Sequence, residues 1–447
     1  MTPAPPARGV SGDAPRKRLE ALLHAALEAV EGGAAVRRQL SRPADGGLVV
    51  GGNTVPPGLP VSLLAAGKAS VPMARAFLEV AGPRVRRGLV VRKDGHGGDL
   101  PGLAGRAASH PVPDARSEAA GRAALALAES AREDEVLVVL LSGGASALLS
   151  CPAPGLRQAD LAATTDRLLA SGADIEAANA VRKHLSALAG GRLARAFRGR
   201  EIHLLAISDV PGDRLDVIGS GPCSPDPSRF ETAWQAVTRL GLEAQLPRAV
   251  CEHLAAGLRG ERAETPAPGD PCFARVHGRV VARNADALAA AAEAAHRRGL
   301  GVTVDPQPLA GDAAAAGRAV LERAQAAGGD GPRVFLAGGE TTVRFERAGR
   351  GGRSQELALA AALVLEGRPG VALLAAGSDG TDGPTDAAGA FADGGSVARG
   401  AARGFSAGEA LARHDSYTFW QAEGGLLRTG PTGTNVMDLV FVMLGGP

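Results

Sequence analysis

Residues 135–149, EVLVVLLSGGASALL, decide the fold that we predict for this chain. The unbroken run of Val and Leu indicates a strand buried on both faces, as in a parallel sheet. Gly143 and Gly144 predict a tight turn, and the residues after them favour a helix. Glycines let the backbone approach an anion, and the first N–H groups of a helix have no partner within it. The stretch therefore suits a phosphate group; an ordinary strand-to-helix connection without a ligand is the alternative.

The composition narrows the class of protein. A chain of 447 residues exceeds what one core usually supports, so we expect two domains. The 49 basic and 47 acidic side chains are interspersed, which favours a small metabolite as partner over nucleic acid or a membrane surface. The four cysteines form no CxxC pair, which indicates a reducing compartment and no structural metal. The sequence has neither a signal-peptide pattern nor a membrane-spanning apolar run, so we expect a cytoplasmic protein.

Alternating strands and helices predict an α/β fold with a doubly wound sheet. After a disordered tail over residues 1–15, we expect a first domain over 16–240 that begins with a docking helix over 16–30. A second α/β domain is expected over 241–447, and its alternation of strands and helices begins after a linker near 266–271. The predicted strands of the first domain cover 61–66, 88–91, 135–141 and 202–208, and those of the second cover 279–282, 302–304, 334–336, 371–375 and 436–444. The last strand either stays in the second domain or returns to the first.

Four Gly-rich turns follow predicted strands, at Lys68, Ser142, Gly338 and Gly377. Since ligands of such sheets bind beyond the carboxyl ends of the strands, these turns mark a cleft. Phosphoryl transfer needs cations on the transferring oxygens and carboxylates that hold a metal. Lys68 and Arg353 are the candidate cations, and the candidate carboxylates are Asp209, Asp213, Asp379, Asp382 and Asp386. Turn capping is the alternative role for each aspartate.

The motifs resemble those of the glycerate 2-kinase family, whose C-terminal portion is called the MOFRL domain. They are LLAAGKAS (63–70), LLSGGASALL (140–149), NAVRKHLSALAGGRLA (179–194), SDVPGDRLDVIGSGPCSPDPS (208–228), GGETTV (338–343), GGRSQELAL (351–359) and AAGSDGTDGPTDAAGAFAD (375–393). The resemblance implies a Rossmann-like N-terminal domain, a C-terminal α/β domain, and a cleft in which ATP and Mg2+ phosphorylate the 2-hydroxyl of D-glycerate. It leaves open whether the chain forms a homo-oligomer.

Carried over to this sequence, the family's functional lysine is Lys68 and its functional arginine is Arg353, for catalysis and substrate binding. We assign Asp209 to the metal or to deprotonating the substrate, and Asp379 to the metal, from their positions in turns. The remaining predicted residues are Ser142, Gly143, Gly144, Ser146, Gly338, Gly339, Glu340 and Thr341 for the nucleotide, and Ser220 and Asn284 for the substrate.

Two positions depart from the family pattern. Ala145 replaces a glycine and still permits a helix start, so the predicted phosphate site survives. Ser354 replaces an asparagine, so the amide that the family has at this position is missing here.

Two other functions compete with the kinase. An NAD(P)H-dependent hydroxypyruvate reductase would need a GxGxxG turn with an acidic residue about 20 positions further on, and no predicted strand is followed by that pattern. A non-catalytic regulator that binds a sugar acid or nucleotide is disfavoured by the cationic and acidic residues in separate loops.

Overall fold

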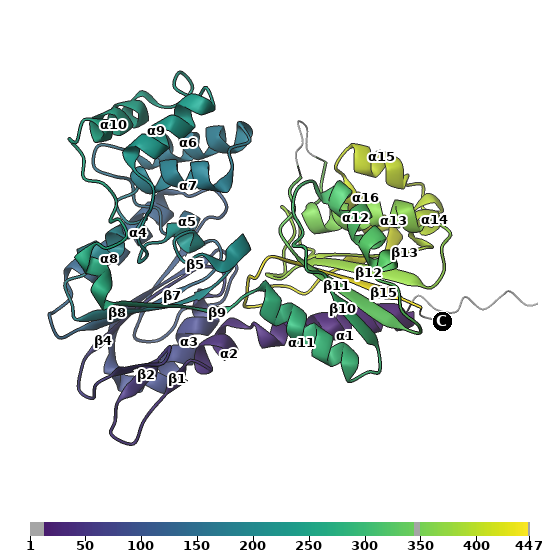
Figure 1. The fold of residues 1–447 in the computed structure, drawn as a ribbon, viewed down its shortest axis with the longest axis horizontal. Coiled ribbons are helices and arrows are strands. Elements are labelled where there is room, and N and C mark those ends of the chain that lie inside the picture. Colours follow the sequence, from purple (N-terminus) through teal and green to yellow (C-terminus); the bar gives the residue numbers. More distant parts are fainter. Residues whose placement is uncertain (1–12, 344–348, 446–447) are drawn as a thin grey trace, which may run out of the picture. The chain divides into compact units, whose positions relative to one another are not determined.

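The computed structural model describes residues 13–343 and 349–445, which form two compact α/β units (Figure 1). The parallel-sheet unit comprises residues 30–283 and 433–436. The mixed-sheet unit comprises the described residues of 13–29, 284–432 and 437–445. Two α/β units confirm the predicted fold class. Among the described residues, no helix is both long enough and apolar enough to cross a membrane.

The parallel-sheet unit is built on six parallel strands. Their order is β6 (Ala104–Ala108), β5 (Val85–Lys93), β4 (Val61–Ala66), β7 (Val136–Leu141), β8 (Glu201–Ile207) and β9 (Val276–Ala282). Strands β4 and β7 are central and wholly buried, as their continuous apolar sequences predict. One face of the sheet is covered by α2 (Gly32–Arg37) and α3 (Ser70–Ala81), and the other by α4 (Ala115–Glu129), α5 (Ala145–Leu148) and α8 (Arg192–Ala196) (Figure 1).

A helical layer stands above the second of these faces. It consists of α6 (Gln158–Ala170), α7 (Ile175–His184), α9 (Phe230–Arg239) and α10 (Arg248–Leu258), which share a separate apolar core around Val181, Phe230 and Leu254 (Figure 1). A small antiparallel sheet is formed by β1 (Leu40–Ser41), β2 (Leu48–Val50) and β3 (Asn53–Val55). Short 3-10 helices lie at Gly82–Arg84, Pro211–Asp213, Ile218–Ser220 and Pro271–Arg275.

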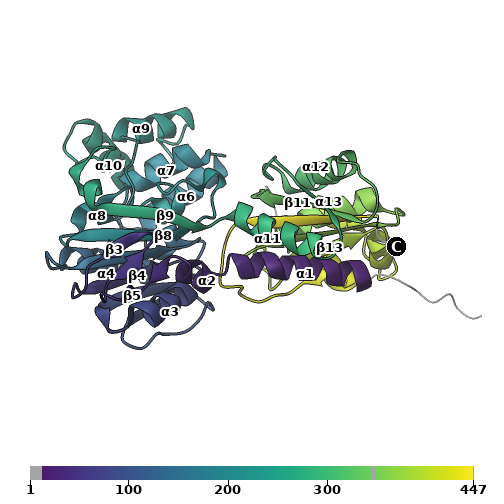
Figure 2. The ribbon, with the colours of Figure 1, turned by 60° about the horizontal axis from the view of Figure 1, so that its bottom comes forward.

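The mixed-sheet unit also has six strands, in the order β10 (Gly301–Val304), β11 (Arg333–Gly339), β15 (Asp438–Leu444), β12 (Val371–Gly377), β13 (Gly389–Asp393) and β14 (Leu426–Leu427). Only β10 and β11 are parallel. Helices α1 (Asp13–Ala29) and α11 (Asn284–His296) lie side by side on one face (Figures 1 and 2). The other face is covered by α12 (Ala313–Ala326), α13 (Arg353–Leu365), α14 (Ser396–Ala401), α15 (Ala407–Ala412) and α16 (Ser416–Glu423).

The compact units divide the chain differently from the boundary predicted at residue 240. Strand β9, which we expected to open the second domain, pairs in parallel with β8 of the first sheet. The predicted linker near 266–271 lies inside the parallel-sheet unit. Helix α1, expected in the first domain, packs on α11 of the mixed-sheet unit. Strand pairing and helix docking join residues far apart in sequence, which local patterns do not encode.

The last strand stays in the C-terminal sheet, between β11 and β12. The segment before it, residues 433–436, belongs to the parallel-sheet unit instead. There the carbonyl of Gly433 accepts a hydrogen bond from Gly32 N at 3.0 Å. Of the two outcomes that the sequence left open, the last strand therefore follows the first and stays in the C-terminal sheet, and only the short segment before it joins the parallel-sheet unit.

Candidate active site

The turn after β4 positions Lys68. The backbone N–H of Lys68 donates to the carbonyl of Gly143 at 2.9 Å, which ties this turn to the one after β7. Gly67 has φ of 125°, and a β-carbon there would overlap Ser142. Only glycine therefore lets the two turns approach this closely.

The side chain of Ser142 also joins the turns after β4 and β7. Its buried Oγ accepts a hydrogen bond from the backbone N–H of Ala69 at 3.0 Å. Since that N–H precedes helix α3, Ser142 fixes the start of the helix that follows Lys68. The hydroxyl that we predicted to contact phosphate is thus engaged with the neighbouring turn.

Gly143 faces a carboxylate and a carboxamide. The Nδ2 atom of Asn435 donates to Oδ2 of Asp209 at 3.3 Å, and a β-carbon on Gly143 would overlap both side chains. Asp209 follows β8, as predicted, and Asn435 comes from the 433–436 segment. Asn435 was missed because no local pattern indicates that a C-terminal turn joins this unit.

Gly144 completes the turn with φ of 87°. A β-carbon at this position would lie 3.0 Å from the His110 ring and 3.6 Å from Cγ of Lys68. The predicted helix after it, α5, is only four residues long. The turn after β7 therefore brings together four predicted site residues, Lys68, Gly143, Gly144 and Asp209. His110, which was not predicted, lies beside them.

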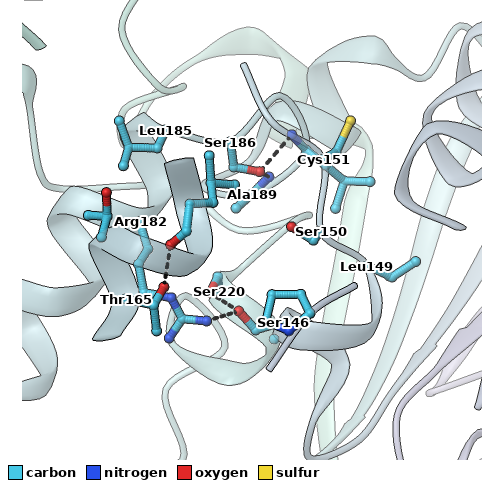
Figure 3. Close-up of a pocket in the computed structure, with 15 residues that line it drawn as sticks. Ser146, Leu149, Ser150, Cys151, Thr165, Arg182, Leu185, Ser186, Ala189 and Ser220 are labelled. Atoms are coloured by element: carbon cyan, nitrogen blue, oxygen red, sulfur yellow. Dashed lines mark hydrogen bonds between the residues drawn. The ribbon is translucent and has the colours of Figure 1, made fainter. Parts of the chain in front are cut away.

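A pocket opens beside the same turn (Figure 3). Its volume is about 530 Å3, including the open mouth, and its walls come from α5, α6, α7 and the Gly219–Ser220 turn. The Ser146 and Ser220 hydroxyls are 2.7 Å apart, and the Arg182 guanidinium donates to Ser146 Oγ at 2.5 Å. Two predicted residues, Ser146 and Ser220, thus share a pocket with Arg182, to which the sequence assigned no role.

In the mixed-sheet unit Arg353, the first residue of α13, lies beside one other predicted site residue, Glu340. Its Nε and Nη2 donate to the two oxygens of Asp438 at 2.7 and 3.0 Å, and its Nη1 donates to Glu340. The neighbouring carboxylates raise the pKa of Arg353 further, despite its burial. Arg353 is therefore a permanently charged cation held by two acidic side chains.

Two aspartates near Arg353 are buried. Asp382 accepts hydrogen bonds from the backbone N–H groups of Ser354 at 3.1 Å and Gln355 at 2.8 Å, which caps α13. Burial raises the pKa of Asp382 to about 6. Burial, opposed by Arg353 and reinforced by the other carboxylates, raises the pKa of Asp438 to about 7. Asp438 was missed because it opens a strand rather than a Gly-rich turn.

The other predicted residues of this unit lie near β11. The Nδ2 atom of Asn284 donates to the Asp438 carbonyl at 3.0 Å, and a β-carbon on Gly338 would overlap the Asn284 amide. Gly339 has φ of 144°, where a β-carbon would overlap the Leu309 backbone. Thr341 is buried, and its hydroxyl has no hydrogen-bond partner among the described residues.

The two predicted metal ligands lie in different units. Asp379 uses one oxygen to accept from the Thr381 N–H at 2.9 Å and hydroxyl at 3.0 Å, which is turn capping. Within the described residues no three His, Cys, Asp or Glu side chains are grouped to hold a metal ion. Mg2+ commonly needs only one or two carboxylates with substrate phosphates, so single aspartates at strand ends fit its chemistry.

Two family models match the sequence. Residues 18–255 match a domain of unknown function, DUF4147, and residues 333–438 match the MOFRL family. The first match covers most of the parallel-sheet unit, and the second covers the part of the mixed-sheet unit that carries Arg353 and Asp438.

Known proteins resemble the chain over most of its length. The glycerate 2-kinase of Pyrococcus horikoshii is 39% identical over 390 residues, which cover 86% of this chain and 87% of that protein. An Agrobacterium vitis protein, provisionally named a hydroxypyruvate reductase, is 40% identical over 393 residues, covering 86% and 87%. The crystal structure of Thermotoga maritima glycerate kinase matches with a TM-score of 0.80 and 36% identity, over 97% of this chain and 100% of that one.

Proposed function

Because the chain belongs to the glycerate 2-kinase family, we propose that it transfers the terminal phosphoryl group of ATP to the 2-hydroxyl of D-glycerate, forming 2-phosphoglycerate and ADP. The observation that carries this proposal is the joined pair of turns after β4 and β7. They bring the Lys68 backbone against the Gly143 carbonyl and place Asp209 beside Gly143. A cation, glycine backbone and a carboxylate at the ends of neighbouring strands are the elements that phosphoryl transfer requires.

In this proposal Lys68 neutralises charge on the transferring phosphoryl oxygens. Its ammonium is a compact point charge on a flexible stem, suited to a group that moves between donor and acceptor. The backbone of Gly143 and Gly144 would face the phosphates, and glycine is needed in this turn because side chains at these positions would overlap Asn435 or crowd His110. Ser142 supports this arrangement through its hydrogen bond with Ala69.

Asp209 is proposed to hold Mg2+ or to accept the proton of the substrate hydroxyl. Its hydrogen bond from Asn435 uses Oδ2, which orients the carboxylate without neutralising it. Asp379 is the second proposed carboxylate for Mg2+, because it follows the end of β12 in a Gly-rich turn. The bound ion would neutralise phosphate charge.

Arg353 is the second proposed cation. Asp438 holds its Nε and Nη2 on the buried side, whereas Glu340, with 38% of its side chain exposed, holds Nη1. We propose that an anionic ligand replaces Glu340 at Nη1, because that contact is the less buried one. Gly338, Gly339 and Thr341 would then line the nucleotide, with Asn284 fixing the strand beside them.

The proposal also includes a cytoplasmic location and no nucleic-acid or membrane partner.

A paired assay tests the proposed function. D-glycerate is supplied with MgATP, and in a separate reaction hydroxypyruvate is supplied with NADH. We expect ADP and 2-phosphoglycerate to form in the first reaction. Oxidation of NADH without ADP formation would instead favour the reductase suggested by the name of the Agrobacterium vitis relative.

A further inference from the structure

The pocket beside α5 contains the guanidinium of Arg182, which contacts a hydroxyl rather than a carboxylate. Figure 3 shows the Arg182 guanidinium directed at Ser146, next to Ser220. Arg182 is the single charged residue among the lining residues, which otherwise carry hydroxyl, thiol or apolar side chains. Among the described residues of its own unit, no carboxylate forms an ion pair with Arg182.

The two residues that follow Arg182 on α7 provide a comparison. Lys183 lies 3.2 Å from Asp226 and 3.6 Å from Asp216, and His184 lies 3.0 Å from Glu264. Both of these buried side chains have acidic partners, as buried charges usually do. Among the described residues of the unit, Arg182 instead donates to the Ser146 hydroxyl, so its neighbours have acidic partners there and its own charge has none.

An uncompensated guanidinium in a pocket is costly in the absence of a ligand. Part of the Arg182 side chain reaches solvent through the pocket, yet desolvation by the surrounding protein lowers its pKa, with no opposing carboxylate. An anion would supply the missing charge and accept hydrogen bonds from the guanidinium fork. The Ser146 and Ser220 hydroxyls add groups that donate or accept at the same place.

We infer that Arg182, together with Ser146 and Ser220, binds the carboxylate of the sugar-acid substrate; the inference rests on the proposed function. A carboxylate carries one negative charge in a planar group, which matches one guanidinium. A nucleotide polyphosphate carries several negative charges, whereas the pocket lining holds one charged residue. Ser146 lines this pocket, and a β-carbon on Gly144, two residues before it, would lie 3.6 Å from Cγ of Lys68, so the carboxylate and the reacting phosphoryl group would each have a cation.

The test compares Arg182→Gln with Arg167→Gln, which removes the same charge from an exposed position on α6. We expect Arg182→Gln to raise KM for D-glycerate at least about tenfold, the size expected for a lost charged hydrogen bond. KM for ATP and the activity toward D-glyceramide, which lacks the charge, should stay within about twofold of the unaltered protein. Arg167→Gln should change none of these values.

A stability measurement separates binding from structural support. Removal of an uncompensated, half-buried charge should leave the thermal midpoint of the ligand-free protein unchanged or higher, since Ser146 and Ser220 keep their mutual hydrogen bond. An unchanged KM for D-glycerate, a larger rise in KM for ATP, or a lower thermal midpoint with equal losses on both substrates would overturn the inference.

Calorimetric titration with D-glycerate alone distinguishes this inference from the proposed function. Binding that is lost in Arg182→Gln, in a protein without kinase activity, would support the carboxylate site and refute the kinase. Equal binding by both proteins would refute the carboxylate site, whatever the kinase assay shows.

Discussion

Asp438 receives two hydrogen bonds from the Arg353 guanidinium, at 2.7 and 3.0 Å, although Asp382 and Glu340 also act on the same cation. Three carboxylates around one guanidinium leave an excess of negative charge in a buried place. Burial, reinforced by this excess, explains why the pKa of Asp438 rises to about 7 in the folded protein.

The raised pKa predicts a pH dependence of stability. Between about pH 4 and pH 7 the folded state holds a proton on Asp438 that the unfolded state has lost, so the free energy of unfolding falls as pH rises. Asp438→Asn should reduce this fall by up to about 1.4 kcal/mol per pH unit, measured by urea unfolding at pH 5 and pH 7.5.

Asp386→Asn is the matched control for that experiment. The pKa of Asp386 is lowered by hydrogen bonds from Tyr417 and Arg428, so its removal should not flatten the fall between these pH values. Equal slopes for the unaltered protein and Asp438→Asn would show that Asp438 is ionised throughout this range.

Lys68→Ala should lower kcat by about two to three orders of magnitude, because a preorganised charge at the transferring oxygens is lost. The fold should persist, since the backbone contact of Lys68 with Gly143 remains. Lys93→Ala, at the end of the adjacent strand β5, is the control. Near-normal kcat in Lys68→Ala would remove Lys68 from the mechanism.

Gly67→Ala should unfold at lower urea concentration, because its β-carbon would overlap Ser142 and its φ is 125°. Gly212→Ala provides the comparison, since Gly212 has φ of 79° and a β-carbon there would have nothing within 4 Å. We expect Gly67→Ala to lose at least about 2 kcal/mol more than Gly212→Ala. Similar losses would mean that backbone conformation, not the approach of the two turns, decides the effect.

Asp209→Asn should raise the Mg2+ concentration needed for half-maximal activity at least about tenfold, because a neutral amide is a weaker ligand of a hard cation. Asp213→Asn, in the same loop, removes the same charge and should leave this value unchanged. If the two variants respond alike, the loop contributes only a general electrostatic field, and Asp209 is not a metal ligand.

Local sequence patterns predicted the elements well and their partners less well. The apolar runs that became β4, β7, β8 and β12 were identified because burial on both faces leaves no polar alternation. Strand β9 was assigned to the other domain because helices α9 and α10 lie between β8 and β9 in the sequence, so the pairing of the two strands joins residues far apart in the chain. The helix at the N-terminal end was likewise predicted, but not that it packs on α11.

For the site, the sequence indicated which turns matter but not what each side chain contacts. Ser142 was expected to contact phosphate, and the sequence did not indicate that its hydroxyl also accepts from Ala69. Arg182 stood in a family motif without a role, since the lack of an acidic partner is visible only in three dimensions. Asn435 and Asp438, three positions apart, were not separated into different units by any local signal.

The central position of β15 has a consequence for how the protein forms. Its neighbours in the sheet, β11 and β12, are both synthesised before it, and they pair with it rather than with each other. Until β15 emerges from the ribosome, each of them presents an unpaired edge that invites association with other chains. We therefore expect chains released before Asp438 to aggregate, and folding of the mixed-sheet unit to be completed only after this strand has been made.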